Sequence, residues 1–207
     1  PAFKGWIGEW KVRTLIRRKL DPATYREFSN VTIVDEAGET TQIDHVYVSP
    51  FGVLVIETKH MGHWIFGSRH QPMWTQQIYR HRKQFQNPLR QNYRHIKALE
   101  SLLGLPGNVF RSVIVFTGDC TFKTKMPEEV CTLSDLIAYI HSIDTRVLTG
   151  EQVDSICRDL QYLRLEPSAR TRHEHVAGLR RRHGGVSSAP PSAPEAKCGV
   201  GGRPGTR

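Results

Sequence analysis

Several features that mark common classes of protein are missing from this sequence. Its four cysteines form no Cys-x-x-Cys pair, which argues against a zinc ribbon, and nothing in their spacing indicates a disulfide framework. The P-loop motif Gly-x-x-x-x-Gly-Lys-Ser/Thr does not occur, so a P-loop nucleotide enzyme is not expected. No apolar run approaches the roughly 20 residues of a membrane-spanning helix. We therefore expect a cytoplasmic protein without a membrane segment, while the start at Pro1 rather than Met leaves open a removed upstream anchor.

Acidic residues are missing from a long internal stretch, because no Asp or Glu occurs between His60 and Leu99. The basic residues of this stretch to which we assign nucleic-acid binding are Arg69, Arg80, Arg82, Lys83, Arg90 and Arg94. Interleaved with them are Trp64, Trp74, Tyr79, Phe85 and Tyr93. Cations can meet phosphates and rings can stack on bases, so the mixture favours a nucleic-acid partner. For each single ring, we consider a place in the hydrophobic core the better interpretation.

The net charge of +9 is concentrated near the C-terminus. Residues 168–207 carry 8 Lys/Arg against 2 Asp/Glu and are rich in Gly, Ser and Pro. Such a segment buries too little apolar surface to offset the entropy lost on ordering. We therefore expect a folded domain over residues 1–167 and a basic, largely disordered tail over residues 168–207.

Hydrophobic periodicity predicts the order of helices and strands. Helices are expected over 8–20, 88–103, 134–141 and 149–163, and strands over 30–35, 41–49, 53–59, 112–116 and 129–133. Asn87-Pro88 has the features of a helix start, and Gly104 stands where a helix-ending left-handed residue belongs. The short turn at 49–52 predicts an antiparallel hairpin. The pattern indicates an α/β (α+β) sandwich, with a mixed sheet flanked by helices.

Three charged residues interrupt the apolar hairpin. Asp44 lies in the first strand, and Glu57 and Lys59 end the second strand on the face that Val53 and Val55 share. If the register brings Asp44 beside Glu57, two carboxylates and an ammonium group meet at the edge of an apolar sheet. Close carboxylates repel each other unless a cation neutralises them, and acidic oxygens suit Mg²⁺ or Mn²⁺. The competing interpretation is an ordinary Glu-x-Lys at a strand end with an unrelated Asp.

Several short blocks occur together along the first half of the chain: Gly8-Glu9, Gln42-Ile43-Asp44-His45, Phe51-Gly52-Val53, Val55-Ile56-Glu57-Thr58-Lys59, Trp74 with Gln76, and Asn87-Pro88-Leu89-Arg90-Gln91. Taken together, these blocks resemble the nuclease-related domain, or NERD, family of the restriction-endonuclease-like PD-(D/E)XK superfamily. In this order they cover residues 5 to about 100.

The resemblance implies a restriction-endonuclease-like core and a Mg²⁺- or Mn²⁺-dependent cut in DNA or RNA, of which we expect DNA, although the sequence does not decide between them. By position, Asp44, Glu57 and the backbone carbonyl of Thr58 would be metal ligands. Lys59 would be the catalytic lysine and Glu9 an accessory acid. The family positions Gln76 and Gln91 would be accessory residues, for each of which a structural hydrogen bond is an equal alternative. The oligomeric state stays open, with a dimer as one option. The alternative function is a non-catalytic nucleic-acid-binding or interaction module on a nuclease-like fold.

Overall fold

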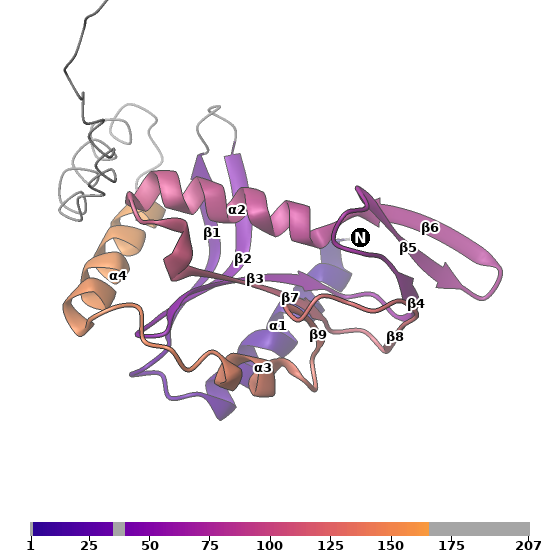
Figure 1. Ribbon diagram of the computed structural model, residues 1–207, viewed down its shortest axis with the longest axis horizontal. Coiled ribbons are helices and arrows are strands. Elements are labelled where there is room, and N and C mark those ends of the chain that lie inside the picture. The colour runs from indigo at the N-terminus through magenta and orange to yellow at the C-terminus, as the bar shows by residue number, and fades with distance from the viewer. Residues whose placement is uncertain (1, 35–39, 166–207) are drawn as a thin grey trace, which may run out of the picture.

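The computed structural model describes residues 2–34 and 40–165 (Figure 1). The expected tail at 168–207 lies outside these residues. The helices are α1 (Ala2–Lys19), α2 (Pro88–Leu103), α3 (Leu136–Ser142) and α4 (Gly150–Leu165), with a short 3-10 helix at Gly107–Val109. The strands are β1 (Arg26–Val34), β2 (Thr40–Ser49), β3 (Gly52–Lys59), β4 (His63–Phe66), β5 (Met73–Ile78), β6 (His81–Gln86), β7 (Phe110–Phe116), β8 (Cys120–Phe122) and β9 (Val130–Thr132).

The main sheet has the strand order β1-β2-β3-β7-β9 and is mixed. The pairs β1–β2 and β2–β3 are antiparallel, whereas β3–β7 and β7–β9 are parallel. Helices α2 and α4 cover one face, where Val53 and Val55 pack, and α1 and α3 cover the other, where Leu54 and Ile56 pack (Figure 1). The expected α/β sandwich, a mixed sheet flanked by helices, is confirmed. Strand β3 is buried on both faces, so Glu57 and Lys59 at its end are charged residues at the end of an otherwise apolar strand.

The residues at both ends of α2 explain why the bounds of this helix could be predicted. Asn87 accepts a hydrogen bond from the backbone N–H of Leu89 at 2.9 Å, and Pro88 occupies the first turn, where its missing N–H costs nothing. Gly104 ends the helix with φ of 64°, a left-handed conformation that glycine adopts without strain. In the last helix, Thr149 and Gln152 cap each other through reciprocal side-chain-to-backbone hydrogen bonds.

Other elements differ from the expectation. Helix α1 begins at Ala2 instead of residue 8, and α3 begins at Leu136 instead of residue 134. A second sheet, with the order β6-β5-β4-β8, was not expected at all, and β5 and β6 extend from the body as a ribbon (Figure 1). Strand β6 is polar and largely exposed, so it lacks the apolar alternation that marks a strand in a sequence.

A change of phase in β2 sets the position of Asp44. Ile43, Val46 and Val48 all lie in the cluster beneath α2 and α4, although a regular strand would place Ile43 on the opposite face from the other two. The break falls opposite Asn30, whose φ is 53° and which is left out of the β1–β2 register. The phase change therefore falls at Asp44, one residue beyond His45, where the paired register between β2 and β3 ends.

Helix α1 passes close over the ends of β3 and β7 at Gly8. A Cβ atom at this position would lie 2.8 Å from the hydroxyl of Thr117 and 3.1 Å from side-chain atoms of Thr58 and His60. The Thr117 hydroxyl is itself hydrogen-bonded to His60 at 3.0 Å. Only a residue without a side chain allows this approach, which carries Glu9 towards the end of β3.

We predict that Gly8→Ala lowers the free energy of unfolding by about 1–3 kcal/mol, because overpacking outweighs the better helix propensity of alanine. The matched control is Gly5→Ala in the same helix, where the added Cβ would make only an ordinary contact at 3.7 Å with Glu9. That change should raise stability by up to about 1 kcal/mol. Urea denaturation of both variants checks the prediction, and equal stabilisation by the two would contradict it.

Candidate active site

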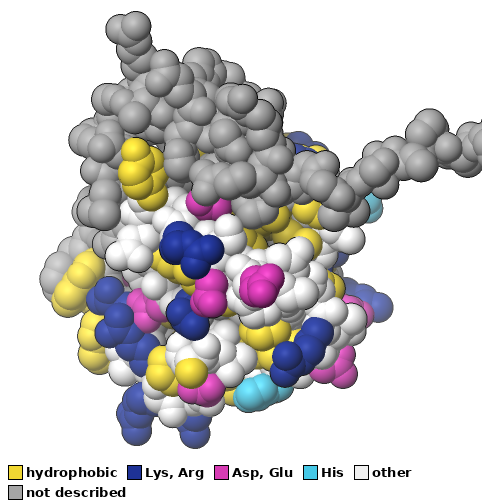
Figure 2. All heavy atoms as spheres, turned by 90° about the vertical axis from the view of Figure 1, so that its left-hand side faces the viewer, with side chains coloured by type: hydrophobic (Ala, Val, Ile, Leu, Met, Phe, Trp, Pro, Cys, Tyr) yellow, Lys and Arg dark blue, Asp and Glu magenta, His cyan; other side chains and the backbone are white. Residues whose placement is uncertain are grey.

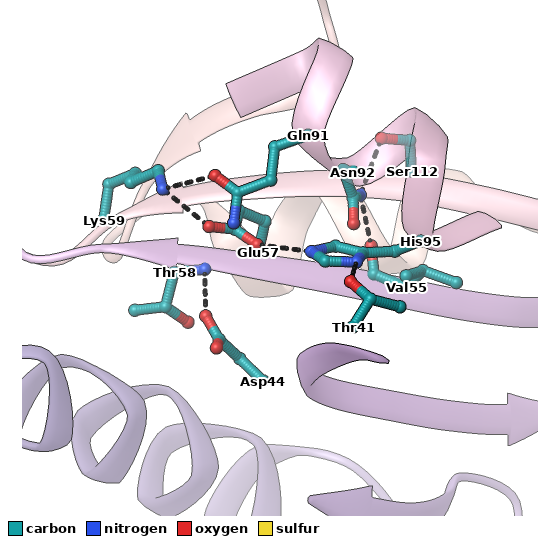
Figure 3. Close-up of polar contacts among 10 residues, drawn as sticks. All are labelled: Thr41, Asp44, Val55, Glu57, Thr58, Lys59, Gln91, Asn92, His95 and Ser112. Carbon is teal, nitrogen blue, oxygen red and sulfur yellow. Dashed lines mark hydrogen bonds and ion pairs between the residues drawn. The ribbon is translucent and has the colours of Figure 1, made fainter. Parts of the chain in front are cut away.

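A lysine at the end of β3 is held by two oxygen atoms from different elements. The ammonium nitrogen of Lys59 donates to Oε1 of Glu57 at 2.6 Å and to Oε1 of Gln91 at 2.9 Å (Figure 3). Glu57 and Lys59 are two residues apart in β3 and point to the same face, and Gln91 reaches them from the first turns of α2. The three side chains that the sequence places in two separate blocks thus form one cluster.

A buried histidine completes the surroundings of Glu57. Nε2 of His95 lies 3.3 Å from Oε2 of Glu57, an ion-pair distance whose angles fall short of a regular hydrogen bond. The other ring nitrogen contacts the hydroxyl of Thr41 at 2.9 Å, so the ring is held from both ends. We did not identify His95 from the sequence. Its signal was the spacing, since His95 follows Gln91 by four residues and therefore shares its helix face.

The electrostatics keep Glu57 ionised despite its burial. Its exposed fraction is only 3 %, and burial alone raises the pKa of a carboxyl group. The pKa of Glu57 is nevertheless lowered from its ordinary value, because contacts with His95 and Lys59 favour the charged form and outweigh that desolvation. Glu57 is therefore a carboxylate at neutral pH, compensated from both of its oxygens.

Asp44 occupies the opposite kind of environment. Its Oδ2 atom accepts a hydrogen bond from the backbone N–H of Thr58 at 2.8 Å, and it lies on the α1 side of β3 while Glu57 and Lys59 lie on the α2 side (Figure 3). Burial and, next, the negative charge of Glu57 raise the pKa of Asp44 to about 7, with a smaller contribution from Glu9. The Thr58 N–H and Lys59 offset only part of this increase. Asp44 thus titrates near neutrality.

Glu9 on α1 takes part in the same electrostatic cluster. Burial raises its pKa, Arg13 lowers it and the charge of Glu57 raises it again, for a net increase. Three acids from α1, β2 and β3 therefore influence one another at the end of β3. Within residues 2–34 and 40–165, however, no three His, Cys, Asp or Glu residues are arranged closely enough to hold a metal ion by themselves.

The predicted accessory glutamines have different places. Gln91 contacts Lys59, whereas Gln76 donates to the backbone carbonyl of Gly62 at 2.8 Å. Gln76 therefore fixes the loop that follows Lys59 and does not reach the charged cluster. This is the structural hydrogen bond that we considered as its alternative.

The basic residues expected to bind nucleic acid are spread over several elements. Arg69 pairs with Glu129, Arg82 donates to Gln77, and Arg90 donates to the carbonyl of His70. The remaining three, all exposed, are Arg80, Lys83 and Arg94. By contrast, Figure 2 shows the face on the α4 side, where basic and acidic side chains are intermingled.

The aromatic residues of the same stretch divide into two groups. Trp74 is fully buried and packs edge-on against Phe85, as the core interpretation expects. Trp64, Tyr79 and Tyr93 are exposed, so for these three the core interpretation is wrong.

Comparison with known families matches residues 4–117 to the nuclease-related domain model. The chain belongs to the NERD family. An uncharacterized protein of Bacillus anthracis is 40 % identical over 162 residues, which cover 75 % of this chain and 74 % of that protein. A crystal structure of a protein of unknown function aligns with a TM-score of 0.34 and 15 % identity, over 88 % of this chain and 100 % of that chain, which is too distant to support an argument.

The NERD match gives the chain a nuclease-related domain and explains the blocks around Asp44, Glu57 and Lys59 as parts of one fold. Among the described helices, none has both the length and the apolar character needed to span a membrane.

We predict that the pKa of Asp44 makes the metal-free protein less stable as the pH rises. Folded Asp44 has a pKa of about 7 against an ordinary value of 3.8, so the folded state binds this proton more tightly. The free energy of unfolding should therefore fall as the pH rises from about 4 to 7. Asp44→Asn should lose this slope and, above pH 7, be more stable than the wild type by on the order of 1–3 kcal/mol.

Urea denaturation in EDTA at a series of pH values measures both effects. The introduced asparagine keeps an oxygen that can accept the Thr58 N–H, so the variant isolates the charge. Wild-type and variant curves with the same pH dependence would show that Asp44 is not the titrating group.

Proposed function

We propose that this NERD domain is a Mg²⁺- or Mn²⁺-dependent nuclease that hydrolyses phosphodiester bonds of nucleic acid, with DNA as the preferred substrate. The observation that supports it most is the contact of the Lys59 ammonium with Glu57 at 2.6 Å and with Gln91 at 2.9 Å, next to an aspartate whose pKa is raised to about 7. Burying a lysine beside acids that repel each other costs folding free energy. Clusters of this kind are typical of catalytic sites, where the charges take part in the reaction.

The acids fit a hard divalent cation. Asp44 and Glu57 offer oxygen atoms, the donor type that Mg²⁺ and Mn²⁺ prefer, and their unrelieved repulsion would be lowered by a bound cation. Two carboxylates are enough, because Mg²⁺ usually keeps several of its waters. A bound divalent ion supplies polarisation of the phosphate and a lower pKa for a water nucleophile.

The carbonyl of Thr58 is the third ligand that we propose. In a strand, the N–H and C=O of one residue point to the same edge. The N–H of Thr58 is directed to Asp44, so its carbonyl faces the same side. The paired register with β2 ends at His45 and Ile56, before Thr58 is reached, so the β2 ladder does not use this carbonyl.

Lys59 and Glu9 have separate roles in the proposed reaction. The Lys59 ammonium stabilises negative charge that develops on the phosphate, and its contact with Gln91 fixes its direction at little further cost. Glu9 stands near the cluster with a raised pKa, which suits a group that exchanges protons with the site. His95 is a positioning residue that holds Glu57 through the contact at 3.3 Å.

A non-catalytic binding module is the second candidate. Both oxygens of Glu57 already face polar partners, the ammonium of Lys59 and the ring of His95, so the cluster is also self-consistent as a structural network. The two candidates differ in cleavage: the binding module gives salt-dependent affinity for nucleic acid and no products during long incubation with Mn²⁺.

We predict that Lys59→Ala lowers the rate of DNA cleavage with Mn²⁺ at least a hundredfold, the usual effect of losing one group that stabilises transition-state charge. The matched control is Lys97→Ala, which removes an exposed lysine of α2 and should cleave like the wild type. Plasmid and linear DNA are incubated with Mn²⁺, with Mg²⁺ and with EDTA. Cleavage that survives EDTA, or unchanged cleavage by a folded Lys59→Ala variant, would sink the proposal.

We also predict that His95→Gln raises the Mn²⁺ concentration needed for half-maximal cleavage by roughly 10–100-fold, because groups that orient a metal-binding carboxylate act through metal affinity. Excess Mn²⁺ should restore most of the rate in this variant and none in Lys59→Ala. His141→Gln, which changes an exposed histidine of α3, is the control. A His95→Gln variant that no metal concentration rescues would contradict the positioning role.

A further inference from the structure

The second sheet presents one face to the core and the other to solvent. Ile65, Trp74 and Phe122 pack inwards against Phe116 and its neighbours. Because side chains alternate along strands, the residues between them form what we call the outer face. The outer face consists of Trp64, Phe66, Met73, Thr75, Gln77, Arg82, Gln84, Gln86 and Thr121.

One row of this outer face crosses the sheet. Trp64 on β4 is in register with Gln77 on β5, and Gln77 is in register with Arg82 on β6. Trp64 is 46 % exposed, and the ammonium of Lys123 lies 4.6 Å from its ring centroid. Nε of Arg82 donates to Gln77 at 3.1 Å, and within the described part of the chain its terminal nitrogens have no further partner. The row therefore places the Trp64 ring between two cations, Lys123 on one side and Arg82 on the other.

The charge of this sheet has one sign. Strands β4, β5, β6 and β8 contain no Asp or Glu, and the hairpin between β5 and β6 adds Arg80 to Arg82 and Lys83. The exposed acidic residue closest in sequence to these strands is Asp119, just before β8. Such a surface is complementary to a chain of phosphates.

The tip of the ribbon holds an aromatic ring in a costly backbone conformation. Tyr79 has φ of 51° and is 82 % exposed, and its ring contacts that of His63, which has φ of 65°, at 5.4 Å between centroids. Bulky residues rarely adopt positive φ, and when they do so the strain often marks a functional position. An exposed ring presented at this cost is available to another molecule.

The sheet is fixed to the strand that carries Lys59. Only residues 60–62 separate Lys59 from β4, and this link is held by Gln76 at the carbonyl of Gly62 and by the N–H of His63 at the carbonyl of Asp119, at 2.7 Å. A strand of nucleic acid that lies along the outer face is therefore kept in a defined place relative to the end of β3.

We propose that the outer face of the second sheet, with Lys123 beside Trp64 and Tyr79 at the tip of the β5–β6 ribbon, binds single-stranded nucleic acid. Bases stack on Trp64 and Tyr79, and phosphates are bound by Arg82 and Lys123. Bases inside a duplex are already stacked on one another, so exposed rings on an open sheet favour unpaired strands. The inference rests on the proposed function in one respect: the bound strand would be the substrate, or the unpaired end of one.

The test is a binding measurement in EDTA, where metal-dependent cleavage cannot occur. Fluorescence anisotropy follows the full chain binding to labelled oligothymidine and oligouridine of about 20 nucleotides, longer than the roughly 4–16 nucleotides that one such surface covers. Trp64→Ala and Tyr79→Ala should each weaken binding roughly five- to a hundredfold. Arg82→Ala should reduce the dependence of affinity on salt. The two oligonucleotides decide between DNA and RNA.

The controls are chosen for residue type and exposure. Tyr162 on α4 is 44 % exposed, and Arg158 on the same helix is exposed, so Tyr162→Ala and Arg158→Ala test for non-specific effects. Both should bind like the wild type. Single-strand affinity that is unchanged in Trp64→Ala, or a preference for a duplex of the same length, would overturn the inference.

Cleavage assays on the same variants separate this inference from the proposed function. If the wild type never cleaves but Trp64→Ala loses single-strand binding, the surface is real and the domain is a binding module. If the wild type cleaves and Trp64→Ala binds single strands normally, the nuclease stands and the inference about the outer face fails.

Discussion

The ion pair between Glu57 and Lys59 joins two side chains of one strand, and the arrangement of the site depends on it. A carboxylate that is 3 % exposed would be forced towards its neutral form unless a cation accompanied it. The lysine supplies this cation from the same face of β3, so no other element has to be adjusted to bring the two charges together. Helix α2 then contributes Gln91 to the lysine and His95 to the glutamate.

The negative charges of Glu57 and Asp44 are compensated to different extents, and this difference gives the site its chemical character. Glu57 contacts the Lys59 ammonium and the His95 ring and has a lowered pKa, whereas Asp44 has a single backbone donor and a pKa raised to about 7. Glu9 adds to the repulsion from α1, which only Gly8 allows to approach so closely. Excess negative charge thus gathers on one side of β3 and a directed ammonium on the other, an arrangement that suits a divalent cation near a phosphate.

Part of this architecture could be predicted from the sequence because it depends on local rules. The two-residue period of side chains along β3 places Glu57 and Lys59 on one face, and the Asn87-Pro88 start and Gly104 end define the bounds of α2. The contacts of Gln91 with Lys59 and of His95 with Glu57 could not be predicted, because they depend on the angle at which α2 crosses the sheet. The phase change at Asp44 could not be predicted for a similar reason, because it depends on the backbone of the partner strand at Asn30. The polar ribbon of β5 and β6 carries little hydrophobic pattern and is held by the burial of Trp74 and by Asn87, whose side chain contacts three carbonyls.

Anomalous diffraction from a crystal soaked in Mn²⁺ tests the central claim most directly, because it locates the cation independently of any activity. We predict an anomalous peak within coordination distance of carboxylate oxygens of both Asp44 and Glu57, with Lys59 still in contact with Gln91. A crystal of the Asp44→Asn variant soaked in the same way should lack this anomalous peak, which would assign Asp44 as a ligand of the cation. A well-ordered crystal in which Mn²⁺ binds only elsewhere, or in which Asp44 and Glu57 keep their metal-free contacts at saturating Mn²⁺, would contradict it.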